Sequence, residues 1–364
     1  MSSITLDMSA SKGMRALLDH LLSSGKVSAV LTPRRDPETG SYDIGLVTGE
    51  CGLASAAPVD PVMVANAGQI LSSLTPTPKP LAAVLKPCEL RAFVERVKRE
   101  QGSLDNVLTV SYTCGGVFPL KDVIEDSFAD TVPGHLKRAA AGEIAEGIRP
   151  TCKVCEHFVP INADVTVSVA GDAGSTSACR IYFKGEMAEG FLDGLEGQRS
   201  DEEFDPTLYT KLSARRLAEK EKLFASLTPS EDGLDGIIGI FGTCVGCHGC
   251  GRVCPICYCV LCDFESRSFD YDTSYFEKEL TGKGALRLPP DTVFFHLGRM
   301  THMSFSCVGC GQCSDTCPVG IPVAAVFKKV GEHTASLFDY VPGRDAEEAI
   351  PVMVFKEEEF TELG

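Results

Sequence analysis

Apolar side chains recur at helical spacing in several parts of this 364-residue chain. Residues 11–24 place methionine and leucine side chains on one face of a helix, and Gly25 follows as a stop signal. A second helix begins at Pro87 and carries leucine, phenylalanine and valine on one side. By the same criterion we expect further helices over residues 65–74, 135–147, 186–195, 202–227, 291–303 and 321–331.

Short apolar runs bounded by turn residues predict strands between these helices. The runs cover residues 27–31, 43–47, 81–85, 106–112, 164–170 and 179–183. From residue 81 to residue 112 the order is strand, helix, strand, which is typical of βαβ units and a parallel or mixed sheet. We therefore predict an α/β fold, in which a mixed-sheet domain over residues 1–235 precedes a mainly helical domain over residues 236–364. The polar helix at 202–227 is the expected boundary.

Composition narrows the class of protein but not its function. Hydrophobic residues make up 44% of the chain, no run of about 18 apolar residues occurs, and the residues after Met1 lack the basic start and apolar run that are typical of a signal peptide. Seventeen cysteines fit the reducing cytoplasm of an anaerobe better than a disulfide scaffold. The net charge of −16 disfavours a nucleic-acid partner, because phosphate binding needs a basic surface. The acidic run Glu357–Glu359 is expected to be a solvated tail.

Two cysteine motifs near the C-terminus carry the clearest chemical signal. Both have the form C-x2-C-x2-C-x3-C-P, the spacing of proteins with two [4Fe–4S] clusters, in which the fourth cysteine of each run ligates the other cluster. We therefore assign one cluster to Cys244, Cys247, Cys250 and Cys317. We assign the other cluster to Cys307, Cys310, Cys313 and Cys254. Structural zinc sites space their cysteines as two separated pairs, so this pattern indicates electron transfer.

Four further cysteines lie in contexts that suit metal ligands. Cys88 follows a proline at a helix start, Cys114 precedes two glycines at a strand end, and Cys152 and Cys155 form a C-x-x-C pair. The first two follow the C-terminal ends of predicted strands, where open α/β sheets place their ligands. Together the four could hold a third [4Fe–4S] cluster. The alternatives are a thioredoxin-like redox pair at the C-x-x-C and two ordinary buried cysteines.

Four segments of the N-terminal domain resemble the beta-subunit family of coenzyme F420-reducing hydrogenase and F420-dependent formate dehydrogenase. They are residues 62–71 (VMVANAGQIL), 86–92 (KPCELRA), 152–155 (CKVC) and 163–175 (ADVTVSVAGDAGS), and the resemblance covers roughly residues 11–200. It implies a domain that holds FAD beside one [4Fe–4S] cluster. The cluster ligands that it implies are Cys88, Cys114, Cys152 and Cys155.

The resemblance also implies flavin contacts near these cysteines. A loop with two glycines follows the strand at 164–170, and its backbone N–H groups would suit a pyrophosphate or a flavin carbonyl, although such a loop is more often only a turn. The candidate contacts in this loop are Gly171, Asp172, Gly174, Ser175 and Thr176. Lys86, beside the first cysteine, stands where the family has a different residue. It is a further candidate that could bind a phosphate or stabilise a reduced, anionic flavin, and the alternative is a solvated side chain.

The long interval between Cys254 and Cys307 favours a helical scaffold for the second domain. Small βαββαβ ferredoxins keep their motifs close together, whereas the helical ferredoxins of heterodisulfide reductase and succinate dehydrogenase iron–sulfur subunits show a similar arrangement to this chain. Three more thiols, which lie just after Cys254, either hold a fourth cluster or are buried. Cys179 or a partner's residue would then complete the ligands. The three are Cys257, Cys259 and Cys262.

The main functional hypothesis is a flavin-containing iron–sulfur subunit of an oxidoreductase complex. It would exchange a hydride with F420 or NAD(P)H at FAD and pass single electrons through three clusters, or four, to or from a partner. The partner would be the catalytic subunit of a hydrogenase, a formate dehydrogenase or a heterodisulfide reductase-like complex. No catalytic side chain is invoked. One alternative is a non-catalytic relay and docking subunit without a hydride substrate, and another is a disulfide reductase that uses Cys152 and Cys155.

Overall fold

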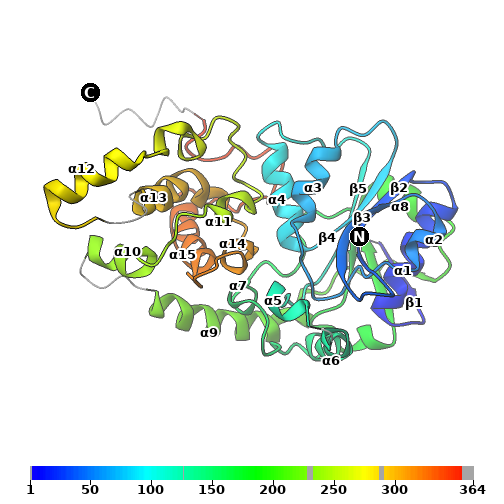
Figure 1. The fold of residues 1–364 in the computed structure, drawn as a ribbon. Coiled ribbons are helices and arrows are strands. Elements are labelled where there is room, and N and C mark those ends of the chain that lie inside the picture. The colour runs from blue at the N-terminus through cyan, green and yellow to red at the C-terminus, as the bar shows by residue number, and fades with distance from the viewer. Residues whose placement is uncertain (1, 126, 228–232, 287–290, 355–364) are drawn as a thin grey trace, which may run out of the picture.

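The computed structural model describes residues 2–125, 127–227, 233–286 and 291–354. Within these ranges the chain forms a sheet-containing N-terminal part and a helical C-terminal part, which lie side by side in Figure 1. The acidic run Glu357–Glu359 lies outside the described residues.

The described part of the chain contains an eight-stranded mixed sheet with the order β3-β2-β4-β5-β6-β7-β1-β8. The pairs β2/β4, β4/β5 and β5/β6 are parallel, and the remaining pairs are antiparallel. The strands are β1 (Ser2–Leu6), β2 (Ala29–Arg35), β3 (Tyr42–Val47), β4 (Leu81–Leu85), β5 (Val107–Tyr112), β6 (Val165–Val167), β7 (Cys179–Phe183) and β8 (Gln198–Ser200).

Helices cover both faces of the sheet and build the whole of the C-terminal part (Figure 1). The helices of the sheet-containing part are α1 (Ala10–Ser23), α2 (Glu50–Leu53), α3 (Ala67–Leu74), α4 (Pro87–Val97), α5 (Leu120–Val123), α6 (Phe128–Ala140), α7 (Pro150–Lys153) and α8 (Gly185–Leu192). The later helices are α9 (Thr210–Ser226), α10 (Leu234–Phe241), α11 (Gly249–Arg252), α12 (Thr273–Lys283), α13 (Thr292–Met303), α14 (Gln312–Asp315) and α15 (Val323–Ser336). No helix of the described residues is long and apolar enough to cross a membrane.

The apolar strand β4 shows why the sheet is covered on both faces. Its side chains alternate between two cores, because successive residues of a strand point to opposite faces. Ala82 and Val84 join the core under α1 and α8, whereas Leu81, Ala83 and Leu85 join the core under α3 and α4. A strand that is apolar at every position therefore lies in the middle of the sheet.

The predicted fold class, a mixed α/β sheet followed by a mainly helical region, is confirmed. The runs at 81–85 and 179–183 coincide with β4 and β7, and 106–112 with β5 to within one residue. The prediction for 27–31 ended too early, because β2 continues through Pro33 to pair with β3 in an antiparallel hairpin. The prediction for 135–147 began too late, since α6 starts at Phe128. Strands β1 and β8 were not predicted.

The two parts meet along α4, which contributes to both. Its Ala92 packs in the core of the helical part, together with Phe241, Phe295 and Phe327. Glu95 is fully buried and accepts hydrogen bonds from Arg99, from the Tyr340 hydroxyl and from the Gly343 N–H. Because the interface is apolar at its centre and hydrogen-bonded around it, α4 fixes the helical part against the sheet.

Candidate functional site

The N-terminal set of predicted cluster ligands lies beyond the C-terminal ends of two central strands of the sheet. Cys88 is in the first turn of α4, directly after β4, and Cys114 follows β5. Since β4 and β5 are parallel neighbours, the chain leaves both strands at the same edge. Cys152 lies in α7 and Cys155 just beyond it, and the Cys114 N–H is held by the carbonyl of Phe158 at 2.8 Å.

These four cysteines line one cavity, which we call the N-terminal cysteine cavity (Cys88, Cys114, Cys152 and Cys155). Lys86 and Arg216 also line it. Its far wall comes from the second C-terminal motif, through Gly309 and Cys310. The structure therefore brings together residues that the sequence separates by more than 150 positions, and it closes the cavity with a residue of another predicted cluster site.

A second cavity contains one of the two predicted ligand sets that combine cysteines of both C-terminal motifs. We call it the middle cysteine cavity (Cys254, Cys307, Cys310 and Cys313). Cys254 belongs to the first motif and the other three to the second, as the crossed assignment requires. Gly309 and Cys310 line both cavities, so the two lie on opposite sides of one wall.

The remaining set, Cys244, Cys247, Cys250 and Cys317, is the distal cysteine group. Burial, partly offset by Arg299 and reinforced by the nearby thiols of Cys244, Cys247 and Cys317, raises the pKa of Cys250 to about 11. Helices α11 and α14 approach closely enough that a Cβ on Gly249 would lie 2.8 Å from Thr316. Cys247 is exposed, whereas Cys250 is buried.

Backbone N–H groups point at several of these sulfurs. Gly116 donates to Cys114 Sγ at 3.3 Å, Gly246 to Cys244 Sγ at 3.4 Å and Ile321 to Cys317 Sγ at 3.3 Å. Gly116 and Gly246 have positive φ values of 101° and 64°, which glycine adopts without the Cβ penalty. Such N–H to sulfur contacts stabilise the negative charge of a cluster and its thiolates.

Two buried arginines test whether an anionic cluster fits these sites. Arg216 donates to the carbonyl oxygens of Cys114 at 3.1 Å and Cys155 at 3.3 Å, and Arg299 donates to Cys250 Sγ at 3.1 Å. The Nε atom of each arginine is buried without a hydrogen-bond partner, and neither side chain pairs with a carboxylate among the described residues. A buried, unpaired cation is costly, so these sites are suited to a group that carries negative charge. A thiolate-ligated [4Fe–4S] cluster is such a group.

The predicted flavin contacts do not form one site in the same way. Lys86 faces the N-terminal cysteine cavity, whereas Gly171 packs against Tyr209 and the helix α6. Three N–H groups of the loop already have acceptors inside the chain: Gly171 donates to Ala139 O, Gly174 to Asp172 Oδ1 and Ser175 to Asp172 O. Asp172 also pairs with Arg180.

The backbone donors that made this loop a flavin candidate are thus engaged. Ser175 and Thr176 likewise use their hydroxyls inside the chain, on the carbonyls of Val169 and Ala173. The flavin contacts at Lys86 and at the loop of residues 171–176 remain predictions from the sequence.

Comparison with known proteins finds relatives of the kind that the resemblance predicted. No protein-family model matches the chain. The F420-dependent formate dehydrogenase subunit beta of Methanocaldococcus jannaschii is 26% identical, and the match covers 91% of each chain. The F420-dependent formate dehydrogenase 1 subunit beta of Methanococcus maripaludis is 29% identical, and the match covers 93% of this chain and 92% of the relative. The chain is a relative of these beta subunits.

The predicted relationship to these beta subunits is confirmed, and it extends beyond the residues 11–200 that carried the resemblance. Among solved structures, a chain of the F420-reducing [NiFe] hydrogenase complex from Methanosarcina barkeri matches with a TM-score of 0.44 and 12% identity. The match covers 64% of this chain and 92% of that one.

The three extra thiols differ in their surroundings. Burial and the neighbouring thiols of Cys254 and Cys262 raise the pKa of Cys257, while Arg299 lowers it. Cys259 is exposed, and Val260 and Leu261, which follow it, are almost fully exposed. Cys179 packs under α1 in the core of the sheet, so it does not complete a set with them. Among the described residues no three His, Cys, Asp or Glu side chains converge on a single metal ion, but a cubane cluster spaces its ligands more widely than one ion does.

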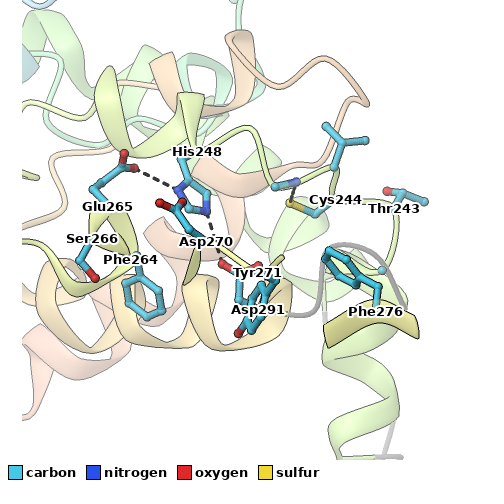
Figure 2. A pocket seen from close by; sticks show the side chains of 13 residues that line it. Thr243, Cys244, His248, Phe264, Glu265, Ser266, Asp270, Tyr271, Phe276 and Asp291 are labelled. Carbon is cyan, nitrogen blue, oxygen red and sulfur yellow. Dashed lines mark hydrogen bonds and ion pairs between the residues drawn. The ribbon is translucent and has the colours of Figure 1, made fainter. Parts of the chain in front are cut away.

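Sequence reasoning missed the charged residues around the cysteines. His248, next to Cys247, lies between Glu265 at 3.0 Å and Asp291 at 3.6 Å in an open pocket that Cys244 borders (Figure 2). His296 approaches Cys244 Sγ at 3.4 Å, and burial lowers the pKa of His296 to about 4, so its imidazole is neutral at pH 7. His248 lies inside the first cysteine motif, but Glu265, Asp291 and His296 belong to no motif, and only the folded chain brings them to this site.

Proposed function

We propose that the chain is an iron–sulfur electron-transfer subunit of an oxidoreductase complex. The observation that carries the proposal is the shared wall of Gly309 and Cys310 between the N-terminal and middle cysteine cavities. Two sets of four thiols on either side of one wall suit electron transfer from site to site, whereas isolated structural sites have no need to be neighbours. The names of the beta-subunit relatives agree with a redox role.

The geometry suggests an order for three [4Fe–4S] clusters, which would supply one-electron transfer when bound. The N-terminal cavity borders the middle cavity through Cys310, and the middle cavity continues to the distal group through the crossed cysteines Cys254 and Cys317. Exposed Cys247 lies at the far end. We therefore propose that electrons enter or leave the chain near Cys247 and that the ligand sets are those assigned from the sequence.

The finer part of the proposal concerns the other end of this path. We propose that FAD in the N-terminal part exchanges a hydride with F420 or NAD(P)H, since flavins convert two-electron chemistry into single-electron steps. Support comes from the resemblance of residues 11–200 and from the F420-dependent relatives. The partner would be the catalytic subunit of a formate dehydrogenase, a hydrogenase or a heterodisulfide reductase-like complex. We also propose that the chain divides into two domains, residues 1–235 and residues 236–364. Its many cysteines suit a reducing, cytoplasmic setting, which belongs to the same proposal.

A relay subunit without its own hydride substrate is the second candidate. It is favoured by one specific observation, the engagement of the Gly171, Gly174 and Ser175 N–H groups inside the chain. A loop whose donors are already paired binds a flavin only after it rearranges, which costs free energy.

Metal and flavin counting on protein purified without oxygen tests the proposal. We expect about twelve iron and twelve sulfide per chain, the content of three clusters, and one FAD. Iron and sulfide without flavin would exclude hydride exchange at FAD and support the relay subunit. A chain without iron would refute both candidates. If flavin is present, mixing with reduced F420, NADH and NADPH in turn identifies the donor that bleaches it. Cys152→Ala should lower the iron content, whereas a disulfide reductase would keep its iron and lose only thiol chemistry.

A further inference from the structure

Arg299 makes a direct contact with a predicted cluster ligand. It lies on α13, and its side chain is 4% exposed. One Nη atom donates to Cys250 Sγ at 3.1 Å and the other to Cys250 O at 3.0 Å. The guanidinium also lies over the ring of Phe327, 4.9 Å from its centroid, which fixes the side chain in one position.

The same side chain faces a second cysteine set. Arg299 lines the middle cysteine cavity together with Cys254 and Cys313. One guanidinium therefore stands between the middle cavity and the distal group, and it is in hydrogen-bond contact with the latter. Its buried Nε has no partner, and no described carboxylate pairs with it.

We propose that Arg299 is a positioning residue that raises the reduction potentials of the clusters in the middle cavity and the distal group; this rests on the proposed function. Reduction adds one negative charge to a cluster, and a nearby cation stabilises that charge. The effect is strong where water is excluded, because Coulomb interactions weaken less in a low dielectric. Hydrogen bonds to cluster sulfurs and local charge are established controls of such potentials.

A purely structural role for Arg299 is the competing explanation, since the side chain also links α13 to the Cys250 carbonyl. The two roles differ in what they predict. A structural role affects stability and iron content but leaves the potential of an intact cluster unchanged. An electrostatic role changes the potential even when the clusters and the fold are intact.

The test compares three variants of the full chain by redox titration followed by electron paramagnetic resonance, with iron counted on each sample. Arg299→Gln removes the charge and should lower two of the three midpoint potentials, those of the middle cavity and the distal group. The remaining midpoint, from the N-terminal cavity, serves as an internal reference. Arg299→Lys keeps a charge but not the paired Nη contacts, so it should lower the same midpoints by less.

Arg252→Gln is the matched control. Like Arg299, Arg252 is an arginine close to the cysteines, since it lies within the first motif between Cys250 and Cys254. Its side chain, however, is 74% exposed and contacts Glu265. Water and salt screen its charge, so its removal should leave every midpoint unchanged.

The outcomes separate this inference from the proposed function. If Arg299→Gln retains native iron and native midpoints, the inference is wrong while the proposed function stands. If Arg299→Gln loses iron, Arg299→Lys decides: lowered midpoints with full iron support the inference, and native midpoints overturn it. A native chain without iron refutes the proposed function, and this inference with it.

Discussion

A cysteine binds iron as its thiolate, so deprotonating a buried thiol is part of the free energy of every cluster site. In this chain burial raises the pKa of Cys114 and of Cys310 to about 12. Both thiols are therefore protonated at neutral pH until a metal arrives, and metal binding releases their protons. The arginines beside the cavities, Arg216 and Arg299, favour the charged product of that exchange.

At the scale of one residue, Cys114→Ala tests the ligand set of the N-terminal cavity. We expect the iron content to fall by up to about four atoms per chain, because a cluster needs its thiolate ligands. Metal analysis and the visible absorbance of the anaerobic protein measure the change. The control is Cys179→Ala, which removes a thiol from the core of the sheet and should leave the iron content as it is. Native iron in both variants would exclude Cys114 as a ligand.

At the scale of an element, α4 connects the sheet to the helical part through Glu95. Glu95→Ala removes the carboxylate partner of Arg99 and of the Tyr340 hydroxyl, and it leaves Lys98 with Glu348 alone. Removing one partner of a buried charge network typically costs about 3–5 kcal/mol of unfolding free energy. Thermal unfolding of the anaerobic protein measures this loss of stability. Glu95→Gln preserves the side-chain volume, so it shows how much of the loss comes from the charge rather than from packing. An unchanged unfolding temperature in both variants would contradict the assigned role.

The Glu95 carboxylate should also make the unfolding free energy of the chain depend on pH in the acidic range. Burial alone would raise the pKa of Glu95, but hydrogen bonds from Ser306, Tyr340 and Arg99 and the charge of Lys98 lower it below the ordinary value of 4.5. A carboxylate whose folded pKa is lowered contributes stability above its unfolded pKa and loses it as the pH falls. Below about pH 4.5, the stability difference between the native chain and Glu95→Gln should therefore shrink.

Elements with strong local patterns were predictable, and elements that depend on distant partners were not. Strand β4 is apolar at five consecutive positions, and α1 has a clear apolar face, so both were found from the sequence. Strand β8 (Gln198–Ser200) is polar and exposed and exists only because β1 offers it an edge. The cysteine sets followed from spacing, but Arg216 and Arg299 reach them from helices far along the chain, which no local pattern reveals.

At the scale of the whole molecule, the buried pair of Arg149 and Asp315 joins the two parts beside the shared wall. Arg149 also donates to the carbonyl of Cys310 at 3.0 Å. Asp315→Ala should lower the unfolding free energy by about 3–5 kcal/mol, because it leaves a buried guanidinium unpaired. The matched control is Asp43→Ala, which breaks the exposed pair with Arg34 and should cost at most about 1 kcal/mol. If Asp315→Ala and Asp43→Ala lowered the unfolding free energy equally, the prediction would be wrong, and Arg149 would have another partner in the variant.

Removal of iron should destabilise the entire chain rather than one part of it. Without clusters, Arg216 and Arg299 face neutral thiols, and two cavities in the interior lose the groups that fill them. Calorimetry on chelated protein should show a lower unfolding temperature, and reconstitution with iron and sulfide should restore it. An unfolding temperature that is the same with and without iron would show that the cavities are stable when empty.

The wall of Gly309 and Cys310 also has a consequence for synthesis of the protein. Cys88, Cys114, Cys152 and Cys155 leave the ribosome long before the two residues that close their cavity. During that interval the four thiols are on a nascent chain whose cavity still lacks one side. The proposed cluster would therefore reach this site most simply during translation, before the C-terminal part folds over the opening.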